Sequence, residues 1–146
     1  MKEPLLISAC LLGTACRYDG ASKGLSAQQL QRLQEVYHLI PVCPEQLGGL
    51  PTPRVPSERC GSAVITADGR DVTAAYEKGA AEALRLAQLL DCRKALLKER
   101  SPSCGSGRIY DGSFSRRLTD GNGVAAQLLA KHGLQVLGET QLEALL

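Results

Sequence analysis

The sequence is poor in aromatic side chains and carries almost no excess charge. Its 146 residues include four tyrosines, one phenylalanine and no tryptophan, and the formal net charge is +2. Proteins that bind nucleic acid stack bases on aromatic rings and follow the backbone with clustered lysine and arginine. Since this chain has few rings and its charges are spread along its length, we expect a small-molecule partner and no nucleic acid.

Long hydrophobic runs are also missing. The apolar stretch near the amino terminus is short, and Glu3 and Pro4 interrupt the region before it. A membrane-spanning helix needs about 20 apolar residues, and a cleaved signal has a different shape. We therefore expect no membrane partner and a cytoplasmic location, where thiols stay reduced. The six cysteines then indicate metal ligands, nucleophiles or buried thiols rather than disulfides.

Three motifs of other cysteine or α/β proteins are absent from the sequence. No paired C-x-x-C announces a zinc knuckle, and no G-x-G-x-x-G for a dinucleotide follows the first apolar run. Thiol phosphatases and arsenate reductases place an arginine after Cys-x5, so that it closes over the bound anion. Here that count from Cys10 reaches Cys16, and Arg17 comes one position too late. These three enzyme or module classes are therefore disfavoured.

Short apolar runs alternate with segments whose apolar residues recur three and four positions apart. The runs predict strands at residues 5–9, 39–43, 94–99 and 134–138. The periodic segments predict helices at residues 26–38, 71–92 and 122–132. This alternation favours an α/β fold, a three-layer Rossmann-like sandwich whose mostly parallel sheet of four to five strands carries helices on both faces. We expect residues 1–146 to form a single domain.

Local signals mark several boundaries of these elements. Ser26 with Gln29 forms a capping-box pattern, as do Thr140 and Glu143 in the last segment, and Asp71 is a plausible cap for the longest helix. Residues 47–61 hold three prolines and three glycines and predict a long surface loop. The following Asp-Gly at residues 68–69 predicts a turn, with a small hairpin around it.

Each of the first three predicted strands delivers a cysteine at or just beyond its end. These are Cys10, Cys43 and Cys104. Right-handed crossovers place the carboxyl ends of parallel strands on one rim, where ligands bind in such sheets. We therefore expect the three cysteines to meet at this rim. Clustered thiolates bind soft metal centres, either zinc or an iron–sulfur cluster.

Two interpretations of this cysteine set remain open beside three separately buried thiols. Three ligands leave one metal position free, as in catalytic sites. Cys16, close to Cys10 in sequence, could instead complete a four-cysteine set. The alternative function is then a non-enzymatic zinc-binding or sulfur-carrier protein that uses the same cysteines. Cys16 could also line the pocket or simply pack.

Polar residues accompany the cysteines. Glu45 follows Cys43 by two positions, and Ser101 precedes Cys104 by three. If the cysteines converge, a proton-transfer group and a hydroxyl that could orient water or substrate converge with them. Taken alone, each residue would be ordinary, a solvated carboxylate and a turn serine. Arg54 could contact a substrate or brace the loops.

Five motifs together resemble one family. "SACLLG", "CRYDG", "VCPE", "GGLPTPR" and "SPSCG" are similar to the motifs of TudS-type thiouracil desulfurases, and the resemblance runs from about residue 6 to residue 132. It implies a [4Fe-4S] cluster held by Cys10, Cys43 and Cys104 alone. It also implies that Glu45 and Ser101 are the catalytic residues.

The chemistry that this resemblance implies is non-redox. The sulfur of a thiolated pyrimidine would bind the iron that has no cysteine, which acts as a Lewis acid. Water, oriented or activated with help from Ser101 and Glu45, would attack the ring carbon and give uracil and sulfide. Glu45 would take part in proton transfer. An iron–sulfur assembly protein is a possible further partner.

Overall fold

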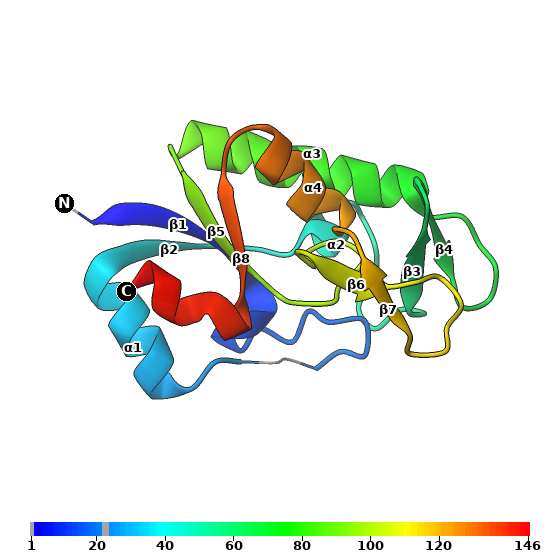
Figure 1. Cartoon of the computed structure of the whole chain (residues 1–146), viewed down its shortest axis with the longest axis horizontal. Coiled ribbons are helices and arrows are strands. Elements are labelled where there is room, and N and C mark those ends of the chain that lie inside the picture. Colours follow the sequence, from blue (N-terminus) through cyan, green and yellow to red (C-terminus); the bar gives the residue numbers. More distant parts are fainter. Residues whose placement is uncertain (1, 22–23) are drawn as a thin grey trace.

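A four-stranded parallel sheet forms the centre of the computed structural model, which describes residues 2–21 and 24–146 (Figure 1). The sheet order is β2-β1-β5-β8. Its strands are β1 (Glu3–Ser8), β2 (Tyr37–Val42), β5 (Lys94–Leu97) and β8 (Gln135–Gly138). All four predicted strands are confirmed, and their pairings are all parallel.

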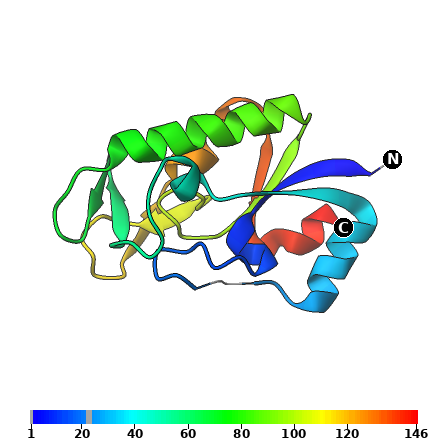
Figure 2. The same ribbon diagram turned by 180° about the vertical axis from the view of Figure 1, so that it is seen from behind.

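Helices cover both faces of this sheet, as predicted. Figures 1 and 2 show two helices along one face, α3 (Thr73–Leu89) and α4 (Val124–Lys131). The other face carries α1 (Ala27–Val36) and a C-terminal 3₁₀ helix (Glu139–Leu145). Because both faces are covered, β1 is apolar at every central position: Leu5 and Ile7 pack with Leu33 of α1, whereas Leu6 packs with Leu129 of α4. None of the described helices is long and apolar enough to cross a membrane.

The boundary between α1 and β2 lies earlier than predicted. The capping box is confirmed, since the Gln29 backbone N–H donates to Ser26 Oγ at 3.1 Å and the Ser26 N–H donates back to Gln29 Oε1 at 3.0 Å. However, Tyr37 and His38, predicted at the helix end, are the first residues of β2. Pairing with Glu3 and Pro4 of β1 outweighs the local helical pattern there.

Strand β2 tolerates Pro41 because it lies at the edge of the sheet. Pro41 pairs with Ile7 near the carboxyl end of the strand. A proline removes a ladder hydrogen bond, so edge strands and irregular positions accept it most readily. Pro41 therefore occupies an edge strand, not the regular central position that its sequence context argued against.

Two antiparallel hairpins and a short helix complete the described chain. The first hairpin pairs β3 (Ser57–Cys60) with β4 (Ala63–Thr66), and the second pairs β6 (Arg108–Tyr110) with β7 (Leu118–Asp120). Helix α2 (Pro44–Leu47) follows β2 directly. The predicted loop at residues 47–61 therefore contains a strand that its polar sequence conceals. Residues 68–69 form the predicted turn, and a single antiparallel bridge between Ile65 and Asp71 makes a minimal hairpin around it. The longer β3–β4 hairpin reverses at Gly61 instead.

The cap predicted for the last segment is wrong. Thr140 donates its backbone N–H to Glu99 at 2.7 Å, and Glu143 pairs with Arg32 of α1 at 2.8 Å. Both side chains are thus engaged by distant elements, and the segment begins at Glu139 as a 3₁₀ helix. For α3, Asp71 accepts from the Thr73 backbone N–H at 2.9 Å and so stabilises the start, although the helix itself begins at Thr73.

Candidate functional site

The carboxyl ends of β1, β2 and β5 open into a cavity of about 590 Å³. Its lining includes Cys10, Cys43 and Cys104, together with Glu45 and Ser101. The structure therefore brings all five residues that the sequence singled out to one cavity. The reason is the parallel topology, which directs the ends of neighbouring strands to the same rim.

Each cysteine is held by the backbone that follows its strand. Cys10 lies in a 3₁₀ helix (Ala9–Leu12) directly after β1. Cys43 is the residue before α2, with Pro44 at the first helical position, where proline is well tolerated. Cys104 stands in a tight turn after β5 and is only 6% exposed. The backbone at Cys10 and Cys43 is therefore placed by the helix that follows each strand, and that at Cys104 by a hydrogen-bonded turn.

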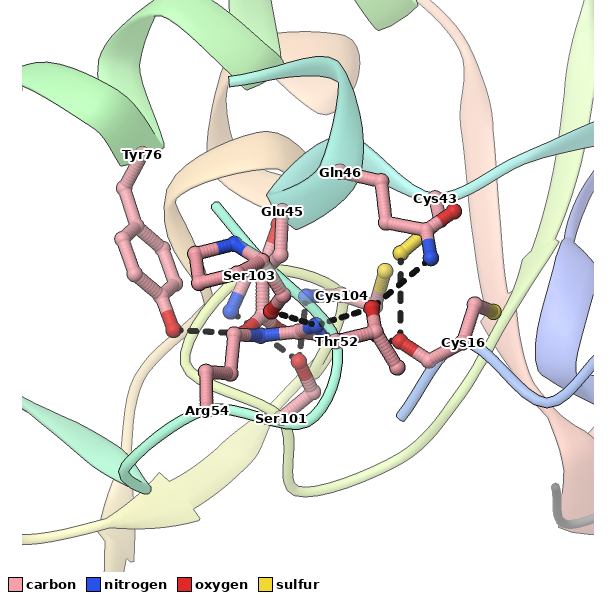
Figure 3. Close-up of polar contacts among 11 residues, drawn as sticks. Cys16, Cys43, Glu45, Gln46, Thr52, Arg54, Tyr76, Ser101, Ser103 and Cys104 are labelled. Atoms are coloured by element: carbon pink, nitrogen blue, oxygen red, sulfur yellow. Dashed lines mark hydrogen bonds and ion pairs between the residues drawn. The ribbon is translucent and has the colours of Figure 1, made fainter. Parts of the chain in front are cut away.

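Ser101 builds the turn that presents Cys104. Its hydroxyl oxygen accepts the backbone N–H of Ser103 at 3.1 Å and that of Cys104 at 3.0 Å (Figure 3). The Gly105 N–H closes the turn on the Ser101 carbonyl at 2.9 Å. A Cβ at Gly105 would lie 2.7 Å from that carbonyl oxygen, so the turn requires glycine. A serine hydroxyl that accepts these bonds can still donate its own proton into the cavity.

Glu45, in the first turn of α2, accepts two hydrogen bonds on one oxygen. Tyr76 Oη of α3 donates to Oε1 at 2.7 Å, and Arg54 Nε donates to the same atom at 3.1 Å (Figure 3). The Arg54 and Glu45 side chains are both mostly buried, so their ion pair is only partly screened by solvent. Sequence reasoning missed Tyr76 because its place on the apolar face of α3 made it look like an ordinary core residue.

Arg54 also connects the acid to the cysteine loop. Its Nη2 donates to the Cys16 carbonyl at 3.0 Å, and its Nη1 donates to Pro51 and Thr52. The Cys43 thiol lies 3.8 Å from the same Cys16 carbonyl. The guanidinium therefore braces the loops, one of the two roles considered for it from sequence.

Burial dominates the electrostatics of the thiols. It raises the pKa of the Cys10 thiol to about 11, with repulsion from Cys43 adding to the effect and Lys98 opposing it. Burial also raises the pKa of Cys104 well above its usual range, although a hydrogen bond from Ser8 acts in the other direction. Protonated thiols are poor nucleophiles, but a bound metal cation can replace the proton. The donor set therefore suits metal ligation better than thiol catalysis.

The donors that could hold a metal centre are the three strand-end thiols on one cavity. Within residues 2–21 and 24–146, no three His, Cys, Asp or Glu side chains are grouped so that they could hold one metal ion. The three strand-end thiols instead share a cavity. Clusters of iron and sulfide are held by cysteine thiolates and occupy more space than one zinc ion. The zinc alternative gains no support from this geometry.

The remaining cysteines differ in position. Cys16 packs with Cys10 and Cys43 beside the cavity, and burial together with these two neighbours raises the pKa of its thiol to about 12. Cys60 lies exposed on β3, and Cys92 is buried in the core beyond α3. Only Cys16 therefore shares the cavity with the three strand-end cysteines, as the sequence suggested it could.

A second wall of the cavity comes from β3 and from the loop between β6 and β7, neither of which was predicted from the sequence. Phe114 and Arg116, between β6 and β7, line the cavity in left-handed backbone conformations with φ of 57° and 61°. Glu58 of β3 fixes this loop, accepting the backbone N–H of Gly112 at 2.9 Å and of Phe114 at 3.1 Å. Arg100, also on the cavity, has φ of 66°. Such strain persists where surrounding structure over-determines it, often at functional sites.

Comparison with known proteins gives matches over nearly the whole chain. Residues 5–141 match the family described as 2-thiouracil desulfurase. A relative, the uncharacterized protein YbbK of Bacillus subtilis (strain 168), is 40% identical over 152 residues, covering 97% of this chain and 99% of that protein. A solved structure of the [4Fe-4S]-dependent thiouracil desulfidase TudS is 51% identical. It covers 99% of this chain and 95% of its own, with a TM-score of 0.94.

Proposed function

The chain belongs to the 2-thiouracil desulfurase family, and we propose that it is a [4Fe-4S]-dependent enzyme that hydrolyses the carbon–sulfur bond of a thiouracil. The observation that carries the proposal is the meeting of Cys10, Cys43 and Cys104 at one cavity that also contains Glu45 and Ser101. The net reaction consumes water and yields uracil and hydrogen sulfide, so no oxidant or reductant is needed.

We propose that the three strand-end cysteines hold the cluster. When bound, such a cluster supplies a thiophilic Lewis acid through the iron that no cysteine ligates. Lys98, whose charge favours the thiolate form of Cys10, lines the same cavity. Cys10 and Cys104 are both buried, so solvent has little access to these two thiols from behind the cavity.

We propose that Glu45 and Ser101 act on the attacking water and on the ring. Both bonds that reach Glu45 go to Oε1 in the described residues, so Oε2 can accept a proton from water or pass one to a ring nitrogen. The Ser101 hydroxyl is fixed by the turn before Cys104 and can donate a hydrogen bond to water or substrate. Both groups are held by short backbone elements, so they are oriented before substrate arrives.

Anaerobic reconstitution followed by turnover assays tests this function. The protein is loaded with iron and sulfide and then given 2-thiouracil or 4-thiouracil, and uracil, sulfide and iron per chain are counted. We expect a brown protein that forms uracil and sulfide in equal amounts only when the cluster is present. A colourless protein that binds one zinc and leaves both thiouracils unchanged would overturn the proposal in favour of the zinc-binding alternative.

A further inference from the structure

Helices α2 and α3 touch through their backbones at two glycines. A Cβ on Gly48, just after α2, would lie 2.0 Å from the Ala75 carbonyl oxygen of α3. A Cβ on Gly79 of α3 would lie 1.8 Å from the Pro44 carbonyl oxygen of α2. Real side chains do not fit at such distances, so the two helices can approach this closely only because both residues are glycine.

This close approach brings Tyr76 against Glu45. Tyr76 stands one turn before Gly79 on α3, and Glu45 follows Pro44 on α2. Tyr76 is 1% exposed, and its hydroxyl reaches Glu45 Oε1 at 2.7 Å. Figure 3 shows the ring of Tyr76 at one side of the carboxylate and Arg54 beside it. If side chains held the two helices further apart, the Tyr76 hydroxyl would lie too far from Glu45 to form this hydrogen bond.

Arg54 and Tyr76 together occupy one oxygen of the carboxylate. Arg54 is itself fixed by the Cys16, Pro51 and Thr52 oxygens, so it cannot follow Glu45 if the acid rotates. Two donors from two different elements define the plane and the tilt of a carboxylate better than one donor can. The orientation of Glu45 is thus set by two donors that both engage Oε1.

We propose that Tyr76 is a positioning residue of the desulfurase, which acts through Glu45 by holding Oε1 so that Oε2 is the atom that exchanges the proton. The inference rests on the proposed function, in which Glu45 moves a proton in the cavity. Burial and the charge of Glu45 raise the pKa of Tyr76 far above its usual range, so the phenol keeps its proton and remains a hydrogen-bond donor to Glu45. Its contribution is geometric, and its effect must therefore vanish when Glu45 can no longer act.

A double-mutant cycle in the reconstituted enzyme tests this dependence. Tyr76→Phe, Glu45→Gln and the double variant are compared with the wild type for kcat, KM, iron content and thermal unfolding midpoint. We expect Tyr76→Phe to lower kcat by about 10- to 100-fold with KM within about twofold, because a misplaced catalytic group costs rate rather than binding. In the Glu45→Gln background the same change should cost less than about twofold.

Tyr37 offers a matched control. It is another buried tyrosine, 2% exposed, and its hydroxyl donates to the Leu145 carbonyl at 2.7 Å on the far side of the sheet. Tyr37→Phe removes an equally short hydrogen bond and should lower the unfolding midpoint by a similar amount. We expect its kcat to stay at the wild-type value, whereas that of Tyr76→Phe falls. Unchanged iron content in both variants shows that the cysteines are undisturbed.

Crystal structures of the wild-type chain and of Tyr76→Phe give a reading that is independent of turnover. We expect the Glu45 carboxylate to be ordered on Tyr76 and Arg54 in the wild type and to be rotated or disordered in the variant. A carboxylate that does not move in the variant overturns the inference, and so does a kcat of Tyr76→Phe equal to that of the wild type. The inference also fails if Tyr76→Phe lowers kcat by the same factor in the Glu45→Gln background as in the wild type. A wild type that leaves thiouracil unchanged overturns the proposed function instead, while the crystal comparison still decides whether Tyr76 orients the Glu45 carboxylate.

Discussion

The two walls of the cavity are built in opposite ways. The wall at the strand ends carries buried Cys10 and Cys104 and partly buried Cys43, and its Glu45 is held by two donors from other elements. The hairpin wall is a loop between β6 and β7, where Phe114 is 38% exposed and Phe114 and Arg116 adopt left-handed backbone conformations. Rigid elements place reacting groups accurately, whereas surface loops tolerate change. In the proposed function, bond breaking belongs to the first wall, and we expect ring recognition at the second.

The largest effect is expected from a cysteine substitution in the wall at the strand ends. Cys104→Ser should abolish cluster binding, because the turn would present a hydroxyl in place of a buried thiol at one of the three proposed ligand positions. Iron content after anaerobic reconstitution and the visible absorption measure the loss, and thiouracil turnover should fall to background. Cys60→Ser, at an exposed thiol on β3, is the matched control. Full iron content in Cys104→Ser would show that this wall does not hold the cluster as proposed.

Glu45→Gln should separate catalysis from cluster binding on the same wall. The amide keeps the size of the side chain but cannot accept a proton, so kcat should fall by about 10²- to 10⁴-fold. Iron content should match the wild type because Glu45 is not a proposed ligand. Steady-state turnover of thiouracil alongside iron analysis checks both statements. A variant with an intact cluster and wild-type turnover would remove Glu45 from the mechanism.

On the hairpin wall the effect should appear in binding. Phe114→Ala removes a ring that lines the cavity, and stacking of a base on an aromatic side chain contributes about 1–3 kcal/mol. Since this ring is partly exposed, we expect the low end of that range, a rise in KM of about fivefold at nearly constant kcat. Phe114→Tyr, which keeps the ring, should behave like the wild type. A fall in kcat at constant KM would break the division of labour between the two walls.

The smallest effect is expected at an ion pair remote from both walls. Arg32 of α1 donates to Glu143 of the C-terminal segment at 2.8 Å and lowers the pKa of that carboxyl below its usual value of 4.5. The stabilisation is therefore present above pH 4.5 and is lost as the pH falls through the lower folded value. Because the pair is exposed, Glu143→Gln should change the unfolding midpoint only slightly at pH 7 and not at all in strong acid or high salt. Thermal unfolding of Glu143→Gln and the wild type at several pH values checks this small effect. A large drop in the unfolding midpoint at neutral pH would contradict it.

Much of the fold was accessible from local patterns in the sequence. Apolar runs of a few residues predicted the four parallel strands, and the capping box at Ser26 predicted the start of α1. Errors occurred where a distant element decided the local structure. Tyr37 joined β2 because β1 offered it a partner, and Thr140 turned to Glu99 instead of capping its own segment.

In the candidate site, too, local sequence patterns predicted some features and contacts between distant elements decided the others. By itself, the sequence determined that three cysteines would meet at one rim, because strand order and crossover hand are general properties of parallel sheets. The contact of Tyr76 with Glu45 and the hairpin loop held by Glu58 were decided only by the tertiary structure. Periodicity reports which side of an element is buried. How closely two backbones approach depends on residues such as Gly48 and Gly79, whose partners lie on another helix, and no local pattern in the sequence contains that distance.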